Sequence, residues 1–141
     1  VTVRVVREPS DITPVDAPGP AEVFAVVQAL ALIPDADREH FGVLMLDAQN
    51  KVRAWQEISV GTMTAALVSP RDLFRRVLAV PHVASIVPVH NHPSGDPTPS
   101  REDIRLTQQL VEAGRLLELP VLDHVIIGDG RFVSLAERGV L

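Results

Sequence analysis

Two histidines, a serine and an aspartate lie close together in one polar stretch of the sequence. His90 and His92 are separated by a single residue, and a loop rich in proline and glycine leads from them to Ser100 and Asp103. Side chains two positions apart on a β-strand leave on the same face, so both imidazoles can reach one metal ion. Two neutral imidazoles and a carboxylate form a known catalytic zinc set in which water takes the fourth position. The spacing therefore favours a metal site that performs hydrolysis.

Ser100 and Asp103 also fit the start of a helix. A serine followed three positions later by an acidic residue, just before the apolar Ile104, is typical of a helix N-terminus whose free amides are bound by side chains. The two residues share a helix face, and the prolines and Gly95 of the loop can turn that face towards the histidines. We expect both residues near the histidine pair, with helix capping alone as the alternative interpretation.

A hydrolytic metal site also needs a carboxylate that takes a proton from water and returns it to the leaving group. The sequence offers Glu39, Asp47, Glu57 and Asp123 as candidates. Glu39 stands just before the apolar segment that starts at Phe41, where it can face a site on an adjacent strand. An exposed loop position for Glu39 is equally compatible with the sequence.

Two further histidines are less informative. His82 falls in a loop between a helix and a strand, and we expect it to face solvent. His124 and the preceding Asp123 are compatible with a core position, with a place at the sheet edge, or with support of the metal ligands.

The elements that must position these residues alternate between strands and helices. Apolar patterns predict strands at 1–7, 41–46, 51–59, 83–89, 121–128 and 131–134, and helices at 21–33, 70–79 and 100–117. A connector rich in proline and aspartate covers 9–20. The alternation predicts an α/β layered domain. Pro88 must then lie at a sheet edge or at a position that donates no hydrogen bond.

Composition narrows the possible functions. The chain has 141 residues and no cysteine, which excludes thiolate catalysis, iron–sulfur clusters and cysteine-ligated zinc. The formal net charge is −5, which argues against a general DNA-binding surface. No apolar stretch approaches the roughly 20 residues that span a bilayer. We therefore expect a cytoplasmic protein with no membrane partner.

The spacing of His90, His92, Ser100 and Asp103 resembles that of the JAMM (MPN-plus) metalloproteases. Within that family, the unbroken HNHPSGDPTPS followed by REDI is similar to the RadC-like branch. The resemblance runs from about Asp37 to Ser134. Further matching segments are Glu39-His40-Phe41 with the VLMLD strand, Gly61-Thr62, Pro70-Arg71, and Asp123-His124 with IIG.

The resemblance implies a set of roles. His90, His92 and Asp103 would bind Zn²⁺, Ser100 would polarise the substrate carbonyl or steady the oxyanion, and Glu39 would be the general base. It also implies an α/β fold, a mixed β-sheet flanked by helices in the JAB/MPN architecture, which is similar to that of the cytidine deaminases.

The function expected from the resemblance is zinc-dependent hydrolysis of a peptide or isopeptide bond, with a peptide or protein substrate such as a ubiquitin-like tail. Residues 1–20 are expected to form an N-terminal strand and connector, and residues 21–141 the RadC-like domain. The RadC branch has long carried a DNA-repair label, so the alternative is a DNA-repair accessory without peptidase activity, which the net charge disfavours. A binding module that uses zinc only structurally is a third possibility.

Overall fold

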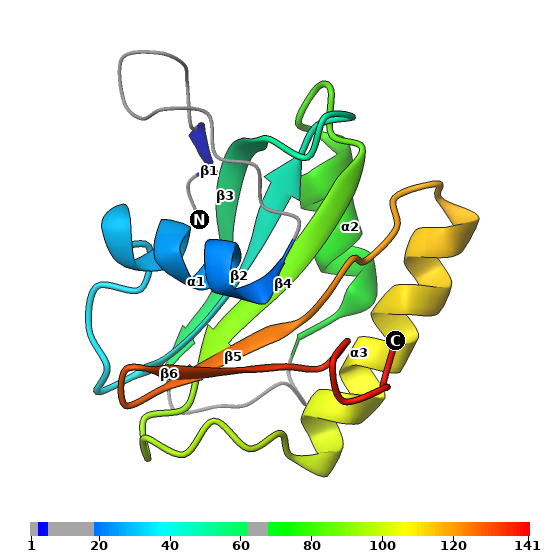
Figure 1. Ribbon diagram of the computed structural model, residues 1–141. Helices are drawn as coiled ribbons and strands as arrows, with labels where there is room; N and C mark the ends of the chain where they lie inside the picture. Colours follow the sequence, from blue (N-terminus) through cyan, green and yellow to red (C-terminus); the bar gives the residue numbers. More distant parts are fainter. Residues whose placement is uncertain (1–2, 6–18, 62–67) are drawn as a thin grey trace.

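The computed structural model describes residues 3–5, 19–61 and 68–141 (Figure 1). Within these ranges the chain forms six strands and three helices. The strands are β1 (Val3–Val5), β2 (Glu39–Leu46), β3 (Val52–Gly61), β4 (Ser85–Asn91), β5 (Val125–Gly128) and β6 (Arg131–Ser134). The helices are α1 (Pro20–Ala29), α2 (Pro70–Leu78) and α3 (Arg101–Leu116). None of these helices is long and apolar enough to cross a bilayer.

The strands form one mixed sheet. Their order is β1-β3-β2-β4-β5-β6, and every neighbouring pair is antiparallel except β4 and β5, which are parallel. The expected α/β fold with a mixed sheet flanked by helices is confirmed. β1 is the edge strand that corresponds to the strand predicted at 1–7, whereas most of the connector predicted at 9–20 lies outside the described residues.

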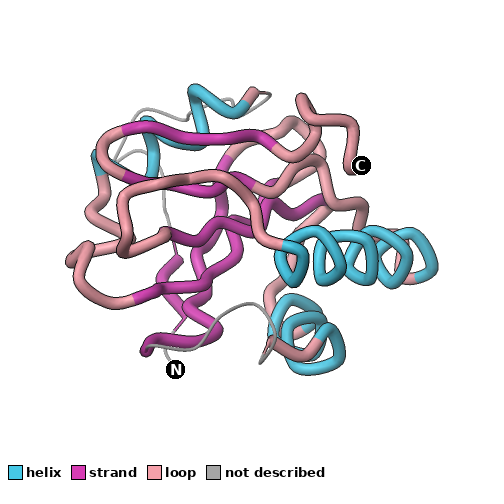
Figure 2. Tube along the Cα trace, turned by 90° about the horizontal axis from the view of Figure 1, so that it is seen from below, coloured by secondary structure: helices cyan, strands magenta, loops and turns pink. Residues whose placement is uncertain are grey.

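The helices lie on opposite faces of this sheet, as Figure 2 shows. We call the side covered by α1 the α1 face and the side covered by α2 and α3 the α3 face. Side chains alternate between the faces along each strand, because a strand has a period of two. The α1 face buries Val23, Val27, Leu44, Trp55 and Val89, among others. The α3 face buries Phe41, Val43, Leu73, Ile86 and Leu110, among others.

Two boundaries differ from the predictions for local reasons. The helix predicted to reach Ile33 ends at Ala29, because Ala31 has a φ of 48° and so leaves the helical conformation. β2 begins at Glu39 and not at Phe41, so Glu39 belongs to the strand and is not a loop residue before it.

Pro88 explains a third difference, the late start of β5. β4 is an interior strand, so Pro88 does not lie at a sheet edge. It falls in a break of the pairing with β5, after an isolated bridge from Ile86 to Val121 and before the register that starts at Val89 and Val125. Between these two pairings, the chain that leads into β5 has one residue more than β4, which is the pattern of a bulge. Because proline has no N–H, the ladder cannot continue through this position.

Candidate metal centre

The structure brings His90, His92 and Asp103 together at the end of β4. His90 Nε2 lies 3.1 Å from His92 Nε2 and 3.2 Å from Asp103 Oδ1, and His92 Nε2 lies 3.1 Å from Asp103 Oδ2. The potential ligand atoms of all three residues lie within 4.8 Å of one another. His90 and Asp103 are buried, whereas the His92 side chain is 15% exposed. Three ligands of this kind can hold one metal ion, with His92 on the side that solvent reaches.

Strand pairing directs both histidines to the α3 face. Phe41 of β2 lies opposite His90 of β4, and their rings stack with centroids 5.2 Å apart. Directly opposite residues point to the same face, and Phe41 belongs to the core on the α3 face. His92 follows two residues after His90 and so keeps the same side, although β4 ends at Asn91. The expectation that the two imidazoles can reach one ion is confirmed by their geometry.

The loop after β4 turns sharply and orients His92. Gly95 has a φ of 89°, in the region that favours glycine, and its N–H donates to the His92 carbonyl. The turn places the Asp96 carbonyl 2.8 Å from His92 Nδ1. A carbonyl oxygen can only accept, so Nδ1 carries the hydrogen. The hydrogen bond between Nε2 and Asp103 raises the pKa of His92, so a metal that binds at Nε2 displaces a proton from this atom.

Ser100 and Asp103 satisfy both interpretations of their spacing. Ser100 is the N-cap of α3, its Oγ accepts from the Asp103 N–H, and Asp103 Oδ2 accepts from the Ser100 N–H at 2.8 Å. This reciprocal pair is a capping box. The same Asp103 carboxylate faces both histidines, so helix capping holds it in place as a candidate ligand. The Ser100 hydroxyl hydrogen takes no part in the capping bond to Asp103.

A chain of hydrogen bonds fixes the tautomer of His90. The Thr107 hydroxyl donates to the Asp103 carbonyl at 2.7 Å, so its oxygen accepts from His124 Nδ1 at 2.6 Å. Burial lowers the pKa of His124 well below its ordinary value, which keeps this ring neutral. Its Nε2 therefore accepts from His90 Nδ1, 2.8 Å away. His90 is left with a lone pair at Nε2, the atom that faces His92 and Asp103.

These tautomers suit a shared cation. When both rings are neutral, their two Nε2 lone pairs face each other, and a positive ion bound by both removes their mutual repulsion; without a metal, protons at this place do the same. Although burial opposes the shift, the neighbouring His90 and His92 hold the pKa of Asp103 well below its usual range, so its carboxylate is ionised. Neutral imidazoles and an ionised carboxylate are the forms in which these side chains bind metals. The donor set therefore fits a metal ion that prefers nitrogen and carboxylate ligands.

Glu39 lies beside this group, at the start of β2. It is two residues from Phe41 and so points to the α3 face, and it is 8% exposed. Burial raises the pKa of Glu39 above its ordinary value, and the charges of His90 and His92 oppose the rise. None of the described residues donates a hydrogen bond to its carboxylate. A buried carboxylate with these surroundings is typical of a functional site.

The other carboxylates considered as bases lie elsewhere. Asp47 follows the opposite end of β2. Glu57 lies on the α1 face, where its Oε1 is 3.0 Å from His40 Nδ1. Asp123 Oδ2 accepts from the Ser134 hydroxyl at 2.6 Å. Of the four candidates, Glu39 is the one whose surroundings include the histidine pair.

Three further residues complete the comparison with the sequence. His124, for which several roles were open, supports His90 directly. His82 is exposed, as expected. Thr107 was not singled out, although it follows Asp103 by four residues on α3 and so shares its helix face.

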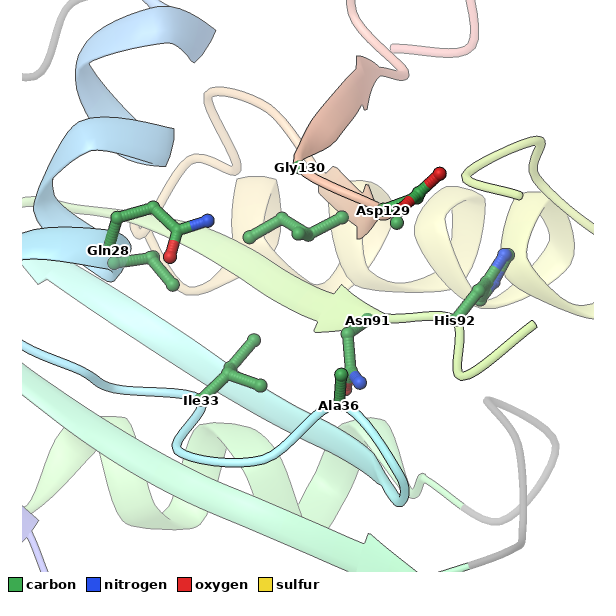
Figure 3. A pocket seen from close by; sticks show the side chains of 10 residues that line it. Gln28, Ile33, Ala36, Asn91, His92, Asp129 and Gly130 are labelled. Carbon is green, nitrogen blue, oxygen red and sulfur yellow. The ribbon is translucent and has the colours of Figure 1, made fainter. Parts of the chain in front are cut away.

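A pocket of about 170 Å³ adjoins the group on the α1 side of the sheet (Figure 3). Apolar walls come from Val27, Ile33 and Ile127, and polar groups come from Gln28 and Asp129. His92 also lines the pocket, so it borders both the pocket and the metal group. A volume near 150 Å³ holds a group the size of benzene, so one amino-acid side chain fits here.

Comparisons with known proteins agree with this geometry. Residues 19–140 match the family described as the RadC-like JAB domain. A UPF0758 protein of Desulforamulus reducens is 53% identical over 107 residues, which cover 76% of this chain and 47% of that protein. A UPF0758 protein of Caldanaerobacter subterraneus is 54% identical over 102 residues, 72% of this chain and 43% of that protein. A UPF0758 protein of Methanosarcina acetivorans is 45% identical over 120 residues, 85% and 51% of the two chains. The chain thus spans about half the length of the curated relatives it matches.

Proposed function

The chain belongs to the family of RadC-like JAB domains, and we propose that it is a zinc-dependent hydrolase that cleaves a peptide or isopeptide bond. The observation that carries this proposal is the convergence of two imidazole lone pairs and an ionised carboxylate beside the buried Glu39. A structural zinc site is normally closed by four protein ligands, whereas three potential ligands come together here within the described part of the chain. Three ligands leave a position for water, which favours catalysis over a purely structural ion.

Each site residue has a defined part in the proposed reaction. Zinc, held by His90, His92 and Asp103, would supply a Lewis acid and an acidified water. Glu39 takes a proton from the attacking water and returns it to the leaving amine. The Ser100 hydroxyl oxygen accepts a hydrogen bond from the Asp103 N–H. The hydroxyl hydrogen can be donated to the substrate oxygen as negative charge develops there.

Two observations support the substrate class that we propose: the resemblance to the JAMM metalloproteases and the pocket beside His92. The pocket that His92 borders has room for one side chain of a substrate. Its apolar walls and polar rim suit an aliphatic side chain with a polar end. We therefore propose a peptide or protein substrate, with a lysine isopeptide as one form of it.

The test is cleavage by zinc-loaded protein of a defined peptide mixture that includes isopeptide-linked peptides, followed by mass spectrometry. We expect cleavage that stops when a chelator removes the metal, returns when zinc is added back, and is absent from Asp103→Ala. Zinc-loaded protein that cleaves none of these peptides would contradict the proposal. Binding of duplex DNA at moderate salt with a steep salt dependence would instead support the nucleic-acid alternative.

A further inference from the structure

Asn91 lies between two candidate metal ligands, yet its side chain points away from them. We propose that Asn91 is a positioning residue that fixes the backbone of Glu39 relative to His90 and His92, an inference that rests on the function proposed above. Side chains alternate along β4, so Asn91 lies on the α1 face while the histidines lie on the α3 face. Figure 3 shows the Asn91 amide directed towards the loop that carries Ala36, and the His92 ring directed elsewhere.

The Asn91 amide makes two hydrogen bonds, and they flank Glu39. Its Oδ1 accepts from the His40 N–H at 2.7 Å, and its Nδ2 donates to the Arg38 carbonyl at 3.0 Å. Arg38 and His40 are the residues directly before and after Glu39. In a parallel ladder a neighbouring strand makes the same pair of bonds around the residue it pairs with. The side-chain amide thus extends the sheet at the point where β4 itself ends.

Burial makes this connection stiff. Asn91 is 4% exposed, and hydrogen bonds shielded from water are costly to lose because the freed groups stay unsatisfied. The ring of His40 is held as well, with Nδ1 3.0 Å from Glu57 Oε1 and Nε2 3.2 Å from Asp35 Oδ1. The segment that carries Glu39 is therefore fixed through both the backbone and the side chain of His40.

The position of the Glu39 carboxylate depends on this backbone. Within the ranges that the structure describes, no residue donates a hydrogen bond to that carboxylate. β3 pairs with Glu39 on one side of β2, and on the other side the pairing with β4 begins only at Phe41. The Asn91 amide supplies the link between the Glu39 segment and the strand that carries the histidines. A general base must lie within hydrogen-bond reach of the proton it removes, so a shift of about 1 Å can reduce the rate of the chemical step about 100-fold.

The first test needs neither metal nor substrate. Amide hydrogen exchange of the metal-free protein is measured by NMR at His40 and, as an internal control, at Leu44 in the middle of β2. We expect Asn91→Ala to exchange at least about tenfold faster at His40 and unchanged at Leu44. Asn91→Asp keeps an acceptor for the His40 N–H, and there we expect slow exchange at His40. Unchanged exchange at His40 in Asn91→Ala would overturn the proposal.

The second test uses zinc-loaded protein and a peptide that the wild type cleaves. We expect Asn91→Ala to lower kcat about 10- to 100-fold, with KM and zinc affinity unchanged. In a Glu39→Gln background, Asn91→Ala is expected to cause no further loss, because both changes act on one step. Asn91→Asp, which loses only the donor to Arg38, is expected to lie between the wild type and Asn91→Ala.

A matched control is available at the other end of β2. Asp47 is also buried, and its carboxylate also accepts backbone N–H groups, from Gln49 and Lys51. We expect Asp47→Ala to lose stability without losing kcat. An equal loss of kcat in Asp47→Ala, or a further loss from Asn91→Ala in the Glu39→Gln background, would reduce Asn91 to a general structural role. A raised KM with unchanged kcat would instead place Asn91 in substrate binding through the pocket it lines.

The two proposals fail separately. A wild type that cleaves no peptide overturns the proposed hydrolase function. Unchanged exchange of the His40 amide in Asn91→Ala overturns the positioning role alone.

Discussion

The two ends of β2 carry buried carboxylates that are held in opposite ways. Glu39 begins the strand and Asp47 follows it, with exposures of 8% and 6%. Asp47 accepts hydrogen bonds from the backbone of Gln49 and Lys51 and from Arg53 Nε, all close to it in the chain. None of the described residues donates a hydrogen bond to the Glu39 carboxylate, which instead lies in the field of two histidines from a segment about 50 residues away in the sequence.

The pKa shifts of the two carboxylates differ in sign. Burial raises the pKa of Glu39, and the histidine charges oppose the rise. Burial acts in the same direction on Asp47, but the hydrogen bonds to Lys51, Arg53 and Gln49 outweigh it and lower the pKa of Asp47. A carboxylate satisfied by near neighbours stabilises a turn, whereas one buried without donors costs stability and is free to exchange a proton. The difference separates a structural carboxylate from a candidate general base.

The largest expected effect is on kcat, and it distinguishes the two ends of β2. Glu39→Gln removes the proposed base and is expected to lower kcat about 10²- to 10⁴-fold, with zinc affinity unchanged. Asp47→Asn is the matched amide substitution and is expected to leave kcat unchanged. Peptide cleavage at equal zinc content measures both variants. Equal activities of Glu39→Gln and the wild type would contradict the assignment of the base.

A smaller effect is expected from the hydrogen-bond chain behind His90. Thr107→Val keeps the shape of the side chain and removes the hydroxyl that accepts from His124. Loss of such outer contacts typically lowers metal affinity about 10- to 100-fold, because the ligand ring is no longer held in one tautomer. Competition with a zinc indicator measures the affinity. Ser69→Ala removes the N-cap hydroxyl of a different helix, α2, and is expected to leave zinc affinity unchanged. Equal affinities of the wild type and Thr107→Val would show that these hydrogen bonds do not support the metal.

The smallest effect concerns stability at the Asp47 end. Asp47→Asn is expected to lower the free energy of unfolding at pH 7 by about 1–2 kcal/mol, because charge-assisted hydrogen bonds are lost. The folded pKa of Asp47 is lowered, so its contribution is complete above the unfolded pKa of about 3.9 and is lost as the pH falls through the folded value. Urea unfolding should therefore show a difference between the two proteins that shrinks below about pH 4. A difference that stays constant between pH 7 and pH 3 would contradict this account of Asp47.

The sequence predicts best the features that are local. The strand, loop and helix around His90, His92 and Asp103 follow from apolar patterns, turn residues and the capping signal, and all of these act over a few positions. The structure places the central helix at Arg101–Leu116, close to the predicted 100–117. The metal group could therefore be predicted from residue spacing, because its members belong to one strand–loop–helix unit.

The contacts that the sequence could not supply depend on distant pairing. His124 and His90 are 34 residues apart, and Asn91 and His40 are 51 residues apart. Both contacts depend on how β4 pairs with its neighbours, and that register is set by the packing of the whole sheet. The predicted start of a strand at Val121 was wrong for the same reason. The residues from Val121 onwards are apolar, but the pairing is interrupted by Pro88 in the partner strand. The left-handed turn at Ala31 is likewise invisible to periodicity.

The most direct test of the central claim is the zinc content of the purified chain and of two variants after equilibrium dialysis. We expect one zinc per chain in the wild type and in Glu39→Gln, since Glu39 is not among the ligands. His92→Ala removes one of three ligands and is expected to bind zinc at least about 100-fold more weakly. A wild type without stoichiometric zinc, or a His92→Ala variant with unchanged affinity, would contradict the account.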